Sequence, residues 1–182
     1  MTSKPTPEID ALMRATAEKY GIDYGLLYAQ VKKESAFDPI AVSACGARGL
    51  MQIMPDTGIK DLGMKEADFF DPAKNLDAGA RYLKRQYKAV RRMIENMPPS
   101  SVNDCSADCY WRLALAAYNG GLGYVIKAIN LCHVERKPLN WVNISGMLAD
   151  PRLVIGKRKL NPDEKQMIDY AEWIWARKEA AS

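Results

Sequence analysis

The amino-acid sequence predicts an all-α protein. Apolar residues recur at helical spacing over most of the chain, residues that favour a helix N-terminus precede several of these segments, and strand-like alternation is scarce. A chain of 182 residues is long enough to bury a core of its own. We therefore expect a single globular helical domain over residues 1–182.

The first two helices are marked by their ends. Thr6 and Pro7 supply an N-cap and a proline at the first helical position, and Gly21 suits the end of that helix. Asp23 can cap a second helix. In this arrangement Glu34 lies near the C-terminal turn of the second helix.

A long amphipathic helix is predicted next. Asp71 and Pro72 repeat the cap-and-proline signal before it, and Pro98 and Pro99 stop it. The face predicted to enter the core consists of Leu76, Ala80, Leu83, Tyr87, Val90 and Ile94. The face predicted to be solvated consists of Lys84, Arg85, Lys88, Arg91 and Arg92.

The segment 109–119 is predicted to be a buried central helix. It is apolar on nearly every side and stops at Gly120 and Gly121, which favour a helix end. A shorter helix is expected after it, over about residues 122–131.

The last helix is expected over residues 162–180. Asn161 and Pro162 provide its start signal, and apolar residues recur at helical spacing after them. The segment 140–156 before it has no clear period, and both a short strand and a loop are compatible with it.

Composition and charge exclude several classes of protein. The chain has 48% hydrophobic and 26% charged residues, which is typical of a globular protein. Its net charge of +4 is spread along the chain, so a nucleic-acid-binding surface is not indicated. No run of about 18 apolar residues predicts a membrane span, and the start MTSKPTPEID lacks the apolar stretch of a signal peptide. We expect a soluble chain whose signal was removed or which reaches its target by another route.

The four cysteines leave the redox compartment open. Cys45, Cys105, Cys109 and Cys132 could form one or two disulfides or stay reduced. A zinc site that includes His133 is disfavoured, because adjacent Cys and His ligands suit a tetrahedron poorly. We expect neither a metal nor an organic cofactor.

Glu34 is a possible general acid. Val31 and Phe37 are its apolar neighbours in sequence, and a carboxyl group partly withdrawn from water has a raised pKa. The alternative is a solvated carboxylate, since Glu34 is one of 22 acidic residues. Position alone therefore does not identify it.

Polar side chains among glycines and apolar residues are a second signal. Gln52 stands in an apolar run after Gly46 and Gly49, and Tyr118 with Asn119 ends the central helix. A buried amide needs hydrogen-bond partners, which could be backbone groups of the protein or the hydroxyl and acetamido groups of a sugar. The residues alone leave both readings open.

Four stretches in order resemble one family. They are ES at 34–35, GLMQIMP at 49–55, NLDAGARYL at 75–83 and AYNGG at 117–121. Together they resemble the lysozyme-like lytic transglycosylase domains of the soluble-transglycosylase type, over about residues 8–135. The resemblance implies a mainly helical fold of the lysozyme-like α+β superfamily, with a cleft for peptidoglycan glycan strands.

The resemblance also implies a mechanism and a set of site residues. Glu34 would be the one catalytic carboxylate, first acid and then base, which leaves a 1,6-anhydromuramoyl end without consuming water. The implied substrate-binding residues are Ser35, Ser43, Gln52, Met54, Tyr118, Asn119 and Tyr170. Tyr170 departs from the family pattern, because the late acidic and tyrosine motif has altered spacing here.

Two rival functions are weighed against this one. A goose-type lysozyme would cleave the same bond with water and would need a second acid, for which Asp38, Asp56 and Asp61 are nearest in sequence. A non-catalytic wall-binding or structural module is the other.

We expect a monomer acting in the periplasm or cell wall. Phage lysis, virion entry, a secretion system and wall turnover are all compatible settings.

Overall fold

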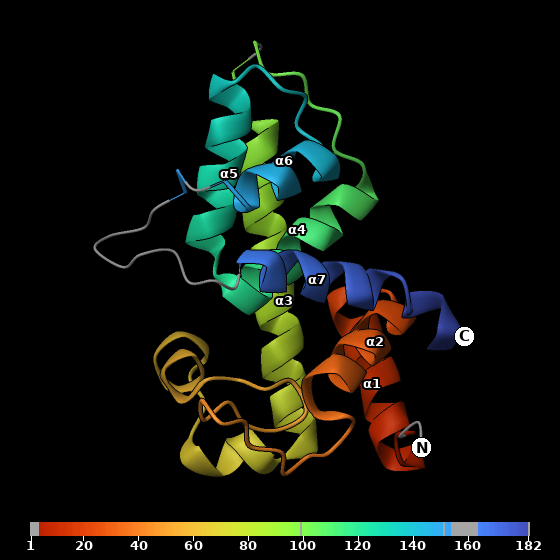
Figure 1. Cartoon of the computed structure of the whole chain (residues 1–182). Helices are drawn as coiled ribbons and strands as arrows, with labels where there is room; N and C mark the ends of the chain where they lie inside the picture. Colours follow the sequence, from red (N-terminus) through yellow and green to blue (C-terminus); the bar gives the residue numbers. More distant parts are fainter. Residues whose placement is uncertain (1–3, 99, 151, 154–163, 182) are drawn as a thin grey trace. The chain divides into compact units, whose positions relative to one another are not determined.

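The regular structure of the protein is helical. A computed structural model describes residues 4–98, 100–150, 152–153 and 164–181. Within these ranges the regular elements are α-helices and short 3-10 or π turns, joined by loops with isolated β-bridges (Figure 1). The predicted all-α class is therefore confirmed.

The chain divides into two compact units. One consists of Met1–Tyr82 with Ile174–Ser182, and the other of Leu83–Trp173.

The first unit begins with two helices whose ends match the sequence signals. Helix α1 (Pro7–Tyr20) is capped by the Thr6 hydroxyl, which accepts from the Ile9 N–H at 3.2 Å, and ends at Gly21 in the left-handed conformation. Helix α2 (Tyr24–Ser35) is capped by Asp23, which accepts from the Leu26 N–H at 2.9 Å. Both predicted helices are confirmed.

A long loop and short turns complete the first unit. The π turn η1 (Thr57–Asp61) and the 3-10 turn η2 (Glu66–Phe70) lead into α3 (Pro72–Glu95). The 3-10 turn η3 (Lys178–Ala181) packs on α2, where Gly25 leaves room: a Cβ there would lie 1.9 Å from the Lys178 carbonyl oxygen. The C-terminal turn is thus anchored on α2.

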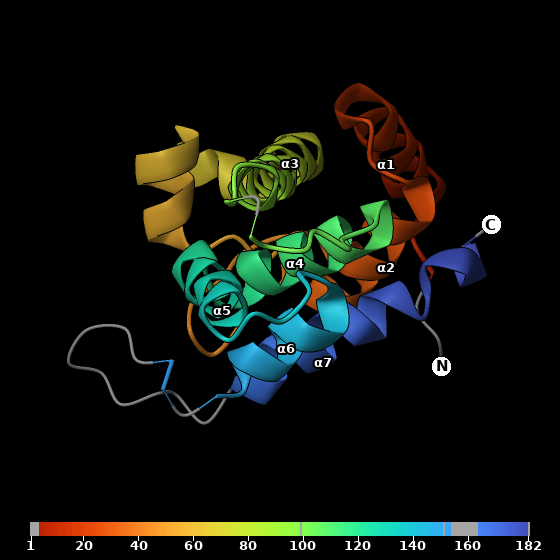
Figure 2. The same cartoon turned by 90° about the horizontal axis from the view of Figure 1, so that it is seen from above.

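The second unit is built from the rest of α3 and four further helices. These are α4 (Ala107–Gly120), α5 (Leu122–Val134), α6 (Trp141–Leu148) and most of α7 (Glu164–Trp175). Helix α5 packs against both α4 and α6 (Figure 2). The predicted central helix is confirmed, since residues 113–117 of α4 are fully buried. The predicted start of the last helix, at Asn161 and Pro162, lies outside the described residues.

The amphipathic pattern of α3 is mostly confirmed. The predicted core face is buried, apart from the half-buried Tyr87. Two side chains differ from the pattern: Gln86 is 3% exposed although it is polar, and Lys84 is half-buried although its neighbours on the basic face are exposed. Lys84 can bury its aliphatic stem while its ammonium group stays near the surface, whereas Gln86 is buried with its head group. The apolar pattern predicts neither.

The segment after residue 140 is a helix, so the expectation of a strand or loop was wrong there. The Asn140 side chain caps α6 by accepting from the Asn143 N–H at 2.9 Å. Trp141, Ile144 and Leu148 then bury one helical face. The β-branched residues in this stretch weaken the helical signal, and tertiary packing overrides it. Residues 154–156 lie outside the described ranges.

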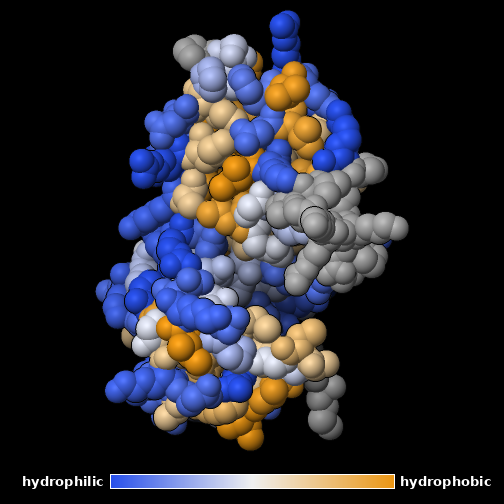
Figure 3. Space-filling view, turned by 90° about the vertical axis from the view of Figure 1, so that its left-hand side faces the viewer, coloured by the Kyte–Doolittle hydropathy of each residue, from blue (hydrophilic) through white to orange (hydrophobic). Residues whose placement is uncertain are grey.

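The surface carries scattered apolar side chains. Figure 3 shows one face on which hydrophilic residues are interrupted by smaller hydrophobic areas. The exposed large hydrophobic residues are Ile40, Val42, Met54, Ile59, Phe70, Val102, Val134 and Val142. Among the described residues no helix has the length and apolar character that crossing a bilayer requires.

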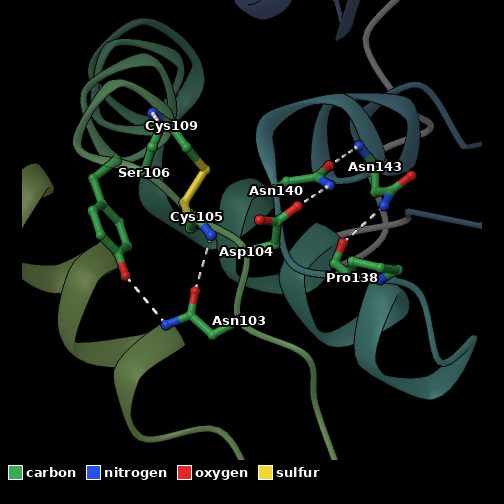
Figure 4. The surroundings of a disulfide bond; sticks show 9 residues. Asn103, Asp104, Cys105, Ser106, Cys109, Pro138, Asn140 and Asn143 are labelled. Carbon is green, nitrogen blue, oxygen red and sulfur yellow. Dashed lines mark hydrogen bonds between the residues drawn. A yellow bond between two sulfur atoms is a disulfide. The ribbon is translucent and has the colours of Figure 1, made fainter.

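A disulfide joins Cys105 and Cys109 at the start of α4 (Figure 4). Their Cα atoms are 5.3 Å apart, and Ser106 between them caps the helix by accepting from the Cys109 N–H at 3.3 Å. Asn103 extends this arrangement, since it accepts from the Cys105 N–H at 3.0 Å. The cross-link therefore reinforces a helix N-terminus that side chains already cap.

The other two cysteines are free thiols. Cys45 is exposed, whereas Cys132 is buried in α5, and this burial raises the pKa of the Cys132 thiol to about 11. His133 shares a hydrogen bond of 2.6 Å between its Nδ1 and the Ser101 hydroxyl. No cluster of three or more metal-ligating side chains occurs in the described part of the chain.

Removal of the disulfide should lower the stability of the protein moderately. We expect the double variant Cys105→Ser/Cys109→Ser to lose about 2 kcal/mol in the free energy of unfolding, because a loop this short removes little entropy from the unfolded chain. Denaturant unfolding under non-reducing conditions measures the loss. Cys45→Ser is the matched control and should leave the midpoint unchanged; an equal shift in both variants would contradict a role for the cross-link.

Candidate active site

Glu34 occupies the last turn of α2, as predicted. Its side chain is half-buried, and the preceding turn packs Gln30 and Val31 into the core. Lys32 and Lys33 lie in the same turn, where cations interact favourably with the negative end of the helix dipole. Glu34 is therefore held by a helix whose opposite face is fixed in the core.

The chain leaves this helix through a strained turn. Ala36 and Phe37 have φ angles of 52° and 69°, a left-handed conformation that residues with a side chain rarely adopt. Phe37 is buried, and its ring centroid lies 4.8 Å from that of Tyr28. Burial of this ring offsets the backbone strain. The turn thus sets the direction of the chain directly after Glu34 and Ser35.

The Ser35 side chain is hydrogen-bonded within the helix end on which Glu34 lies. Its hydroxyl donates to the Val31 carbonyl oxygen at 3.2 Å, and the residue is 9% exposed. A serine that bonds back to the preceding turn satisfies its own hydroxyl within the helix. In this structure the Ser35 hydroxyl is therefore directed back along α2 toward Val31.

The loop that follows is a compact double turn. Ser43 accepts from the Ala47 N–H through its hydroxyl at 3.0 Å, and their backbones are bonded as well, at 2.9 Å. Arg48 forms isolated bridges with both Val42 and Ile53. Ser43 is exposed and lies at the corner of this loop.

The Gln52 side chain forms hydrogen bonds within the loop. Its φ angle is 46°, and its Nε2 donates to the carbonyl oxygens of Ala41 at 3.2 Å and Gly49 at 3.0 Å. Two residues later Met54 is 43% exposed, between neighbours that are more buried. The sequence alone leaves backbone groups and sugar groups open as partners of this amide. In the structure its nitrogen bonds to the protein backbone.

Asn75 is a site-shaping residue that the sequence analysis missed. It is 1% exposed, its Oδ1 accepts from the Met51 N–H at 2.8 Å, and its Nδ2 donates to the carbonyl oxygens of Phe69 at 2.9 Å and Arg48 at 3.1 Å. A single amide thereby joins the loop, η2 and α3. The available signal was that Asn75 opens the stretch NLDAGARYL, on which the family resemblance partly rests.

The remaining predicted residues lie in the second unit. Tyr118 is half-buried and Asn119 is exposed, both in the last turn of α4. Tyr170 is buried in α7, at 4% exposure. Helices α4 and α7 meet at Gly120, where an added Cβ would lie 2.2 Å from the Met167 sulfur. The structure thus groups Tyr118, Asn119 and Tyr170 within one unit, and the other five predicted residues within the first.

A known protein family matches most of this chain in sequence. The family described as the transglycosylase SLT domain matches residues 11–137, which is more than half of the chain. This chain belongs to the SLT domain family. The matched range includes Glu34, the loop around Gln52, Asn75 and the Tyr118-Asn119 pair.

Two curated relatives of the SLT domain have the same name. A membrane-bound lytic murein transglycosylase C from Edwardsiella ictaluri is 33% identical over 64% of this chain and 32% of its own length. The protein of that name from Yersinia enterocolitica is 33% identical over 65% of this chain and 33% of its own. The chain spans about a third of the length of these relatives.

Solved structures share the fold. The lytic transglycosylase Slt from Pseudomonas aeruginosa, in an inactive mutant form, superposes with a TM-score of 0.65 at 20% identity over 94% of this chain and 24% of its own. The 70 kDa soluble lytic transglycosylase from Escherichia coli gives 0.64 at 21% identity over 92% and 23%. At these identities the likeness shows the lysozyme-like helical fold that the sequence predicted.

The loop of the SLT domain should be far more sensitive at Gly49 than at Gly46. A Cβ on Gly49 would lie 2.2 Å from the Phe69 carbonyl oxygen and 2.4 Å from the Asn75 Nδ2, so Gly49→Ala should cost at least about 3 kcal/mol. Gly46 has a positive φ but open space around it, so Gly46→Ala should cost about 1 kcal/mol. Thermal unfolding of both variants measures this. Equal losses would contradict the close approach of the loop to Asn75.

Proposed function

We propose that this SLT domain is a lytic transglycosylase that cleaves the bond between N-acetylmuramic acid and N-acetylglucosamine in peptidoglycan. The observation that carries the proposal is Glu34, a half-buried carboxyl group at a fixed helix end beside a strained turn, in a chain of this family. Strain of this kind is concentrated at functional sites. The murein transglycosylases C of Edwardsiella and Yersinia support the same reaction by their names.

In the proposed reaction Glu34 acts first as an acid and then as a base. Its proton passes to the glycosidic oxygen while the bond from that oxygen to C1 of the muramoyl sugar breaks, and N-acetylglucosamine leaves with a free hydroxyl. The Glu34 carboxylate then accepts the proton of the muramoyl 6-hydroxyl as that oxygen bonds to C1. The product is a 1,6-anhydromuramoyl end. Because Glu34 finishes the cycle protonated, one carboxyl group is sufficient and no water is consumed.

Two of the three acidic residues nearest to Glu34 in sequence, Asp38 and Asp56, already have local roles. Asp38 accepts from the Ile40 N–H at 3.0 Å, and Asp56 forms an ion pair of 3.1 Å with Lys60. Both are exposed. These contacts favour the single-carboxylate reaction over hydrolysis with a second acid.

The loop residues are proposed to shape the cleft around the cleaved bond. Met54 offers an exposed apolar side chain for the face of a sugar ring, and Ser43 a hydroxyl at the loop corner. Gln52 has its nitrogen committed to the loop, so its carbonyl oxygen is the group proposed to accept from the substrate. For Tyr118, Asn119 and Tyr170, contact with the substrate remains a proposal from family resemblance.

The setting proposed for the reaction is the periplasm or the cell wall. Peptidoglycan glycan strands are the proposed partner, and the protein is proposed to act as a monomer. The disulfide between Cys105 and Cys109 supports an oxidising compartment, since disulfides are rare in reducing cytoplasm.

Glu34→Gln should abolish cleavage while the protein stays folded. An amide of the same shape cannot supply the proton, so we expect turnover of purified peptidoglycan to fall by at least about a thousandfold with an unchanged unfolding midpoint. Mass spectrometry of the fragments released by the unaltered protein should show 1,6-anhydromuramoyl ends, lighter than reducing ends by the mass of a water molecule.

Asp38→Asn is the matched control for this variant. The amide oxygen can still accept from the Ile40 N–H, so activity should stay within about twofold of the original. Reducing ends among the products, together with loss of activity in Asp38→Asn, would replace the proposal by hydrolysis. Full activity of Glu34→Gln would reject Glu34 as the acid.

A further inference from the structure

A basic groove follows the second half of α3, within the unit Leu83–Trp173. Its volume is about 370 Å³, and the helix presents one charged face to it. The charged residues that line it are Lys84, Lys88, Arg91, Arg92 and Glu95. Their spacing of three to four residues places them on one side of the helix, over about 12 Å from Lys84 to Arg92.

The charge of this groove is unbalanced. Among the described residues that line it, Glu95 is the one carboxylate, against four cations. Glu95 pairs with Arg91 at 2.7 Å, and no salt bridge to Lys88 or Arg92 is found within the described ranges. The Arg91–Glu95 pair is an exposed i,i+4 pair within α3, so it balances one of the four cations.

Lys84 is held in place at the other end. Its ammonium lies 5.2 Å from the ring centroid of Tyr87 and 5.0 Å from that of Trp111, and these rings are 4.2 Å apart. Burial lowers the pKa of Lys84, and the nearby charge of Lys88 lowers it further. An anion between the two ammonium groups would relieve this repulsion.

We propose that this groove binds the carboxylates of peptidoglycan stem peptides and so retains the protein on the wall. The inference rests on the proposed function, which supplies a substrate with such groups. The cations are distributed along the helix over about 12 Å and do not converge on one point. This distribution suits several separate carboxylates along a peptide better than one compact anion. Arginine and lysine both bind carboxylates through charge-assisted hydrogen bonds.

A binding experiment with an inactivated protein tests this. Glu34→Gln leaves the wall intact, and in that background Lys88→Gln/Arg92→Gln removes two groove cations. We expect sedimentation with insoluble peptidoglycan to show about five- to tenfold weaker binding at low salt, and a smaller difference at high salt. The control Lys4→Gln/Lys165→Gln removes the same charge from two exposed positions and should weaken binding by less than about twofold.

The chemical attribution is tested with glycan strands from which the stem peptides have been removed. The groove variant and its parent should bind these strands equally. An equal loss on stripped strands, or an equal loss in the control, would overturn the assignment to peptide carboxylates. If the parent binds stripped strands and the groove variant binds intact wall as well as the parent does, this inference alone is rejected. If the parent binds neither form of the wall, that result counts against the proposed function as well.

Discussion

The amide of Asn75 is the interaction on which the candidate site of the first unit depends. It satisfies three backbone groups from two different segments, at a position that is almost inaccessible to water. A buried polar network of this kind is rigid only when every member is paired. The loop that carries Gln52 and Met54 is therefore fixed to α3 and η2 through this one side chain, in addition to the hydrogen bonds within the loop.

The strain near Glu34 and at Gln52 is located where that support is strongest. Ala36, Phe37 and Gln52 each have a positive φ, and each adjoins a buried anchor or a hydrogen-bonded turn. Local contacts alone would relax such angles. The surrounding core thus holds a backbone path that the loop would not adopt by itself.

The sequence predicted the fold class and the helices whose ends carry strong local signals, such as Thr6-Pro7 and Asp23, since capping acts over a few residues. It failed at α6, where burial of Trp141 and Ile144 decides the conformation. Glu34 was identified through its motif, whereas Asn75 was missed because its partners lie up to 27 residues away. Long-range hydrogen bonds leave no periodic trace in a sequence. The division into two compact units was likewise invisible there, and the single domain over 1–182 stays a prediction.

The disulfide at the start of α4 closes only a five-residue span, so its two sulfur atoms meet as soon as that turn of helix forms. Pairing is thus selected by proximity along the chain, and Cys45 and Cys132 compete poorly because both lie farther away along the chain. Oxidation can follow secondary structure without waiting for the tertiary fold. The local sequence thus favours this connectivity over the alternatives that the other cysteines offer.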